Sequence, residues 1–329
     1  MTIDSNRLES LSSQLVAARG GDRVALARLI SIVERSAGRD VTMEAMLRLH
    51  PGESYTVGIT GAPGAGKSTL LNMLLSEAVS EQRRTAVLAI DPSSPLSQGA
   101  MLGDRLRMPR LAGNDNVYMR SMASRGMLGG MAAAVHQTMR ILASAGWPWV
   151  VVETIGAGQT EVDIAATADT VIVVLTPGAG DEIQAFKAGL MEIADIFLIN
   201  KADLPGAQKT RNDVLGMLTT LQGRRWIPPV VDTVALKDIG GGAVWQAIDA
   251  HRAFLEVNGL LQSKRRERTE IELMSLARRN FDARLKQARQ VPATQSLVDD
   301  VLAGRLDIQT AAAQLSEEAA RVQFAAAKD

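Results

Sequence analysis

The 329-residue chain is 46% hydrophobic and 22% charged, which supplies a sizeable core and is not the composition of a disordered protein. Its 36 basic and 36 acidic side chains cancel, which argues against a broad basic surface for nucleic acid or an anionic membrane. The absence of cysteine excludes disulfides, thiolate catalysis and cysteine-ligated zinc.

Residues 4–50 are predicted to be helical. Apolar residues repeat at helical spacing on either side of Gly20-Gly21, which interrupts the pattern, and Asp22 is suited to cap the second helix. We therefore expect a helical N-terminal extension over residues 1–50.

Short apolar runs replace this pattern from residue 55 onward. They are continuous rather than alternating, as in parallel strands covered by helices on both faces. Helical stretches separate them, and this alternation predicts a doubly wound, mostly parallel α/β domain over residues 51–259. The predicted strands are 55–60, 86–91, 149–154, 170–176, 195–200 and 229–236, and the predicted helices between them are 67–82, 128–145 and 182–192.

The last part of the chain lacks strand patterns. One long helical stretch is predicted over 244–290, where Pro292 follows and would end it. Two shorter helices are expected next, one ending at Gly304 and one beginning near Asp307. We expect residues 260–329 to form a helical C-terminal arm.

A phosphate-binding loop is predicted at the end of the first strand, where the sequence matches G-x-x-x-x-G-K-[ST]. Its glycines let backbone N–H groups approach phosphates, and the start of the next helix adds the positive end of its dipole. Lys67 offers a cation to the outer phosphates, and the Ser68 hydroxyl can bind Mg²⁺. A chance glycine-rich turn is the alternative, but the strand before it and the helix after it argue against that. The predicted phosphate-binding residues are Gly61, Ala62, Pro63, Gly64, Ala65, Gly66, Lys67, Ser68 and Thr69.

A guanine-reading motif is predicted at Asn200-Lys201-Ala202-Asp203, at the end of an apolar strand. The Asp203 carboxylate can accept from both N1–H and the N2 amino group of guanine. Adenine has an acceptor at N1, so ATP would leave that carboxylate unsatisfied at a cost of roughly 1–3 kcal/mol. Lys201 can lie along the base while Asn200 braces the loop. The sequence therefore predicts GTP and GDP as ligands.

Val234-Ala235-Leu236 occupies the position of a third nucleotide-binding segment. Such segments usually read Ser-Ala-Lys or Ser-Ala-Leu, and Val234 departs from that pattern. The backbone of Ala235 can still reach the guanine oxygen.

Three carboxylates, together with Ser68, are candidate ligands for Mg²⁺. Asp91 and Glu153 end predicted strands at the carboxyl edge, where α/β proteins bind ligands, and Asp104 lies in the following loop. A solvated loop charge is the alternative for each.

Lys67, Gln159 and Lys187 are the candidate catalytic residues. Gln159, in a glycine-containing loop, could position the attacking water, by analogy with other GTPases. Lys187 lies in a loop that either moves near the nucleotide or is an ordinary strand-to-helix turn. An arginine among Arg105, Arg107, Arg120 and Arg125 could neutralise charge on the transferred group, although surface arginines are the simpler interpretation.

Six methionines crowd into one stretch of the chain. Methionine fills irregular cores but also builds adaptable partner surfaces, and both interpretations stay open. These residues are Met101, Met108, Met119, Met122, Met127 and Met131.

Together, the phosphate loop, Asp91-Pro-Ser-Ser94, the Asp104 loop, the Glu153…Gln159 segment and the Asn200–Asp203 motif resemble the MeaB/ArgK-type P-loop GTPases. The resemblance covers about residues 20–260. It implies a GTP-hydrolysing chaperone that loads intact adenosylcobalamin into methylmalonyl-CoA mutase and protects that enzyme. It also implies a homodimer with the C-terminal arm at the contact.

Other functions stay open beside this one. They are a transport-associated kinase of the ArgK type, a chaperone for another cobalamin or metal enzyme, and a nucleotide-gated binding module with negligible turnover. Residues 264–289 carry nine basic side chains against four acidic ones, which is more typical of a solvated helix than of a nucleic-acid site. We expect neither a nucleic-acid nor a membrane partner, and, since no secretory signal or apolar stretch of ~20 residues is present, a cytoplasmic protein.

Overall fold

The computed structural model describes residues 3–36, 38–91, 111, 113–123, 130–154, 167–178, 190–220, 223 and 225–322. Within these ranges the chain divides into two compact units, residues 3–268 and 269–322. The boundary falls inside the helix α12 (Leu260–Ala288). The division predicted at residue 259 stays a prediction.

The first unit is built on a seven-stranded sheet in which every pair of neighbours is parallel. The strand order is β3-β2-β4-β1-β5-β6-β7, so the chain winds outward in both directions from β1. This confirms the predicted doubly wound, parallel fold. The strands are β1 (Tyr55–Gly61), β2 (Thr85–Asp91), β3 (Val117–Ala123), β4 (Trp149–Thr154), β5 (Thr170–Leu175), β6 (Ile196–Asn200) and β7 (Val230–Thr233).

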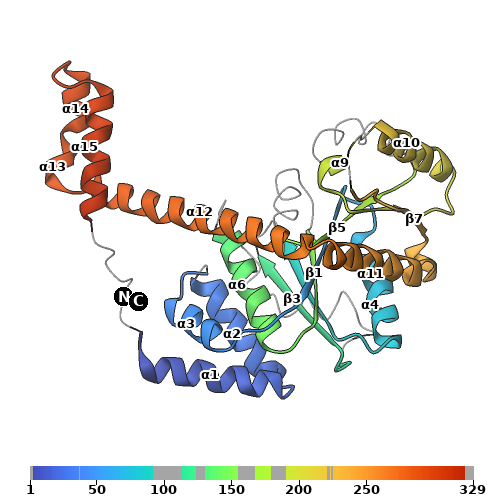
Figure 1. The fold of residues 1–329 in the computed structure, drawn as a ribbon. Helices are drawn as coiled ribbons and strands as arrows, with labels where there is room; N and C mark the ends of the chain where they lie inside the picture. Colours follow the sequence, from blue (N-terminus) through green and yellow to red (C-terminus); the bar gives the residue numbers. More distant parts are fainter. Residues whose placement is uncertain are drawn as a thin grey trace. The chain divides into compact units, whose positions relative to one another are not determined.

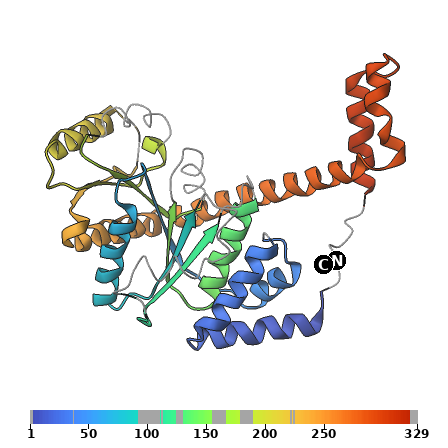
Figure 2. The ribbon, with the colours of Figure 1, turned by 180° about the vertical axis from the view of Figure 1, so that it is seen from behind.

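Helices cover both faces of this sheet (Figures 1 and 2). On one face, α4 (Lys67–Ser80) and α11 (Gly241–Val257) pack over one core cluster. On the other, α6 (Gly130–Ser144) and α10 (Ala207–Thr220) pack over the second cluster. Successive residues of β5 alternate between the two clusters, so the strand is buried on both sides, which explains its continuous apolar sequence.

The N-terminal extension is helical, as predicted, and packs outside α6. It consists of α1 (Ser5–Arg19), α2 (Arg23–Ser36) and α3 (Val41–Leu49). Asp22 accepts hydrogen bonds from the backbone N–H groups of Val24 and Ala25, which confirms it as a helix cap.

The C-terminal helices differ in detail from the prediction. The long stretch is interrupted at Asn258-Gly259, where Gly259 has a φ of 67°, so α11 and α12 are separate helices. Pro292 does not end a helix but begins the short α13 (Pro292–Gln295), because proline fits the first turn. Then follow α14 (Leu297–Leu302) and α15 (Ile308–Arg321). The second of these begins beside Asp307, as expected, and Asp307 caps it.

Two further elements complete the described chain. The short helix α9 (Leu190–Ile193) is all that the structure describes of the helix predicted over 182–192. The turn η1 (Ala235–Lys237) follows β7. None of the helices in the described ranges is both long enough and apolar enough to span a membrane.

Candidate functional site

The glycine-rich loop joins β1 to α4 at the carboxyl edge of the sheet. Gly61 and Gly66 both have positive φ, 144° and 86°. A Cβ on Gly61 would lie 2.2 Å from the Val174 carbonyl oxygen, and one on Gly66 would lie 2.5 Å from Asn200 Nδ2. Only glycine fits this path. Because Gly66, the N-cap of α4, has no side chain, the first turn of α4 presents its N–H groups at the loop.

Lys67 lies folded back over this loop. Its Nζ donates to the carbonyl oxygens of Gly61, at 2.5 Å, and Ala62, at 2.9 Å, and the residue is only 7% exposed. The ammonium group is therefore held beside the N–H groups of the same loop, which together form a concentrated positive region suited to an anion.

Asn200 joins the glycine-rich loop to the two loops that follow β6 and β7. This buried side chain donates to the Ala65 carbonyl oxygen at 2.8 Å, and its Oδ1 accepts from Ala235 N at 3.2 Å and from Thr233 Oγ1 at 3.3 Å. Three segments far apart in sequence thus meet at one amide.

Lys201 and Asp203 extend from the same loop into solvent. Lys201 has a φ of 58°, unusual for a residue with a side chain, and its Nζ donates to the Gly64 carbonyl oxygen at 3.0 Å. Asp203 accepts from Lys237 Nζ at 2.7 Å, and this bond lowers the pKa of the Asp203 carboxyl. Lys237 is a residue that the sequence analysis missed.

Val234, Ala235 and Leu236 form the loop opposite Asp203. Ala235 is buried and fixed by Asn200, whereas Leu236 is 86% exposed. Serine at position 234 is not needed to close this loop, since the backbone groups of Val234 and Ile239 bond to each other in both directions.

Ser68 and Glu153 meet below the glycine-rich loop. Ser68 Oγ donates to Glu153 Oε1 at 2.7 Å, and Glu153 is only 1% exposed at the carboxyl end of β4. A hydroxyl and a carboxylate are hard oxygen donors, so this pair fits Mg²⁺ chemically. Asp91 ends β2, but its side chain and all of Asp104 lie outside the described residues. Among those described, no group of three metal-binding side chains occurs.

Several predicted residues cannot be placed. Gln159, Lys187, Arg105, Arg107, Arg125 and all but two of the six methionines lie outside the described residues or have side chains that do. Arg120, on β3, bonds to Glu34 and Ser31 of α2 and so faces the helical extension. Met122 is buried and Met119 is partly buried against the core, which favours the core interpretation for these two.

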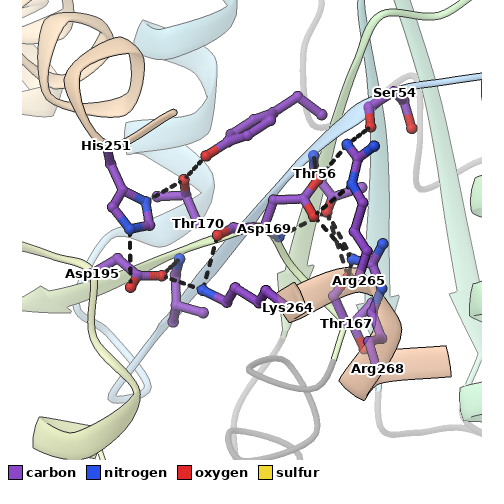
Figure 3. Close-up of polar contacts among 12 residues, drawn as sticks. Ser54, Thr56, Thr167, Asp169, Thr170, Asp195, His251, Lys264, Arg265 and Arg268 are labelled. Atoms are coloured by element: carbon purple, nitrogen blue, oxygen red, sulfur yellow. Dashed lines mark hydrogen bonds and ion pairs between the residues drawn. The ribbon is translucent and has the colours of Figure 1, made fainter. Parts of the chain in front are cut away.

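A second polar cluster lies at the opposite edge, where the strands begin (Figure 3). Asp169, 1% exposed, accepts from the backbone N–H of Thr56 at 2.9 Å and pairs with Arg265 and Arg268 of α12. Lys264 Nζ, also from α12, donates at 2.9 Å both to the Asp169 carbonyl oxygen and to Asp195 Oδ2. These three basic residues fix the start of α12 beneath the sheet, which accounts for part of the basic run at 264–289 without nucleic acid.

The same cluster contains a chain of buried hydrogen bonds. Thr170 Oγ1 lies 2.6 Å from the Tyr55 hydroxyl and 2.8 Å from His251 Nδ1, and His251 Nε2 lies 3.3 Å from Asp195 Oδ1. Burial lowers the pKa of His251 to about 4, and burial raises the pKa of Tyr55. A neutral imidazole that accepts at Nδ1 and donates at Nε2 satisfies every bond in this chain.

Comparisons with known proteins agree with this geometry. The family described as "Methylmalonyl Co-A mutase-associated GTPase MeaB" matches residues 26–290. A relative in Pyrococcus abyssi with a GTPase description is 49% identical over 263 residues, which are 78% of this chain and 80% of that protein. The GTPase ArgK of Escherichia coli K12 is 34% identical over 299 residues, which are 84% and 90% of the two chains. A crystal structure described as an LAO/AO transport system kinase has a TM-score of 0.69 and 26% identity, and the match covers 96% of this chain and 99% of that one.

Proposed function

The chain belongs to the family of methylmalonyl-CoA mutase-associated GTPases, and on this basis we propose that it is a GTP-driven chaperone of an adenosylcobalamin-dependent methylmalonyl-CoA mutase. That it is a P-loop GTPase follows from the family and its relatives. The proposal concerns its ligand contacts, its client and its assembly.

One observation carries the choice of nucleotide. The Asn200 side chain bonds to the phosphate loop and to the loop after β7, so that a carboxylate, Asp203, stands at a fixed distance from a phosphate site. A ligand that spans both regions needs an anionic end and a base with two adjacent donors, and a guanine nucleotide has both. In this proposal Lys201 lies along the base and the Ala235 N–H region faces the guanine oxygen.

The phosphates lie in the loop from Gly61 to Thr69, beneath the first turn of α4. Lys67 Nζ, which donates to the carbonyl oxygens of Gly61 and Ala62, would bind the outer phosphates from this position beside the loop. Ser68 and Glu153 would hold Mg²⁺, with Asp91 and Asp104 as further candidates. The metal supplies charge neutralisation for the transferred phosphoryl group.

Hydrolysis requires a water positioned behind the outer phosphate. We assign that task to Gln159, and we assign Lys187 together with Lys67 to stabilising the developing negative charge. The buried Glu153 holds the Ser68 hydroxyl near the same phosphates.

The client is proposed from the family description, which names methylmalonyl-CoA mutase. GTP binding and hydrolysis would be coupled to the loading of intact adenosylcobalamin and to the protection of the mutase. The chaperone would act as a homodimer, with residues 260–329 at the contact.

The test compares GTP and ATP turnover with Mg²⁺, with and without the mutase, for wild type and Asp203→Asn. GTP turnover that the mutase stimulates, and that Asp203→Asn reduces at limiting GTP, supports both the nucleotide and the client. Turnover that the mutase leaves unchanged, with no complex detectable by size, removes the client. Comparable turnover of ATP favours a kinase of the transport-associated type instead.

A further inference from the structure

We infer that Lys237 is a positioning residue for guanine recognition, because it holds the Asp203 carboxylate in the orientation that accepts both donors of the base. This inference rests on the proposed role of Asp203 in reading guanine. It adds a residue outside the three-residue segment Val234–Leu236 that the sequence motif marks.

The contact joins two loops that are distant in sequence. Lys237 Nζ lies 2.7 Å from Asp203 Oδ2, which is a hydrogen bond and an ion pair across 34 residues. The Asp203 side chain is 34% exposed and that of Lys237 is 60% exposed, so the pair lies at the surface. A pair this exposed contributes little to folding. Its contribution to ligand binding is larger, because a bound base would cover the carboxylate.

The backbone that carries Lys237 is fixed. Val234 N donates to the Ile239 carbonyl oxygen at 3.0 Å, and Ile239 N donates back to the Val234 carbonyl oxygen at 3.3 Å. Within this closed loop, Lys237 N bonds to the Val234 carbonyl oxygen at 2.9 Å, and the next residue, Asp238, has a φ of 55°. A positive φ at a residue with a side chain indicates a backbone held by its surroundings.

The loop is also tied to the strand end that carries Asp203. Ala235 N donates to Asn200 Oδ1 at 3.2 Å, and Ala202 N donates to the Thr233 carbonyl oxygen at 3.0 Å. The Lys237–Asp203 bond is therefore the outermost of several links between the same two segments. It holds the Asp203 side chain, which the two inner bonds do not involve.

Orientation and charge both matter for reading guanine. An ionised carboxylate only accepts hydrogen bonds, and its two oxygens have about four acceptor positions. Lys237 takes one position on Oδ2 and leaves the others for N1–H and the N2 amino group. Because the bond to Lys237 also lowers the pKa of Asp203, the carboxylate stays an acceptor that does not match adenine.

The experiment measures equilibrium affinities for GDP and for xanthosine diphosphate, both with Mg²⁺, by calorimetry. Xanthine replaces the N2 amino group with a carbonyl oxygen, so an amide in place of Asp203 should favour it. The variants are Lys237→Met, which keeps the stem, and Lys237→Arg, which keeps the charge. The control Lys209→Met removes an exposed lysine from α10 of the same unit. Each substitution is made alone, and Lys237→Met is also combined with Asp203→Asn.

Lys237→Met should weaken GDP binding about three- to fivefold, in the upper range for exposed ion pairs. Lys237→Arg should restore most of this affinity, and Lys209→Met should leave it unchanged. In the Asp203→Asn background, Lys237→Met should also weaken the binding of xanthosine diphosphate, but less. The change in the logarithm of the affinity should be at most about half of the change for GDP with Asp203 present, because a bond to a neutral amide is weaker.

Two results would overturn the inference. One is an equal loss of affinity in both backgrounds, which would mean that Lys237 supports the loop in general or contacts the nucleotide directly. The other is unchanged or tighter GDP binding by Lys237→Met, which would make the pair either incidental or a competitor of the base. If Asp203→Asn fails to move the preference from GDP toward xanthosine diphosphate, the proposed guanine-reading role of Asp203 falls, and the role of Lys237 falls with it.

Discussion

The buried ring of His251 should make the stability of the sheet-bearing unit depend on pH. Its pKa is lowered from 6.5 to about 4, chiefly by burial, so the folded chain keeps the ring neutral while the unfolded chain binds a proton. The stabilisation is complete above pH 6.5 and is lost as the pH falls toward 4. Lowering the pH from 7 to 5 should therefore reduce the free energy of unfolding by about 1.5–2 kcal/mol through this one residue.

The assay is urea unfolding at pH 7, 6 and 5, without nucleotide, followed by tryptophan fluorescence. All four tryptophans lie in the unit of residues 3–268, so this signal reports the unit that contains His251; they are Trp147, Trp149, Trp226 and Trp245.

Other groups titrate in the same range, so the test is the difference between wild type and His251→Gln. The variant will be less stable at pH 7, because it disturbs the bonds to Thr170 and Asp195. Between pH 7 and pH 5, however, its free energy of unfolding should fall by about 1.5–2 kcal/mol less than that of the wild type. His50→Gln, at the end of α3 outside this network, is the control and should keep the wild-type slope. Parallel curves for wild type and His251→Gln would refute the reasoning.

Three further predictions concern the buried Asp169 cluster, the Asn200 side chain and the glycine-rich loop. Asp169→Asn should lower the free energy of unfolding by about 2–3 kcal/mol in the same urea assay, because two partly buried guanidinium groups lose their counter-charge. The control is Asp232→Asn, which removes the carboxylate of a more exposed pair with Arg211 and should lower the free energy of unfolding by under about 1 kcal/mol. Asn200→Ala should reduce GDP affinity at least about tenfold in calorimetry, because three hydrogen bonds between loops are lost, and unchanged affinity would contradict this. Gly66→Ala and Gly64→Ala each place a side chain at positive φ, at a cost of about 1–2 kcal/mol. Only the new Cβ at position 66 meets another atom within 4 Å, so the melting temperature of Gly66→Ala without nucleotide should fall further than that of Gly64→Ala.

The parallel sheet was predictable because most of its strands have a recognisable, continuously apolar sequence. β4, β5 and β6 contribute apolar side chains to both core clusters and therefore read as nearly unbroken apolar runs. β3 was missed for the opposite reason. It lies at the edge of the sheet and carries Arg120, which needs a partner on α2 rather than a place in the core.

The nucleotide loops were predictable because their backbone demands particular residues. A Cβ at position 66 would lie 2.5 Å from Asn200 Nδ2, so only glycine fits there, and this restriction leaves a pattern in the sequence. The contact between Asp203 and Lys237 leaves no such pattern. Many side chains are tolerated at an exposed turn, so a lysine there carries no signal until the two loops are seen together.

The buried cluster at the opposite edge could not be predicted either. Asp169 and Arg265 lie 96 residues apart, and each alone resembles an ordinary polar residue at the start of a strand or on a helix. Their pairing depends on where α12 passes beneath the sheet. Such a long-range arrangement is set by the packing of whole elements.

The way α12 begins also limits how the protein can be shortened. A polypeptide that stopped after residue 259 would keep all seven strands and both nucleotide loops, yet it would lose every basic partner that α12 offers to Asp169 and Asp195. A polypeptide that ran on to Arg268 would retain them all. The nine residues from 260 to 268 thus separate a fragment whose two carboxylates lack their basic partners from α12 from one that keeps them, and the longer fragment is the better choice for crystallisation or fusion to other domains.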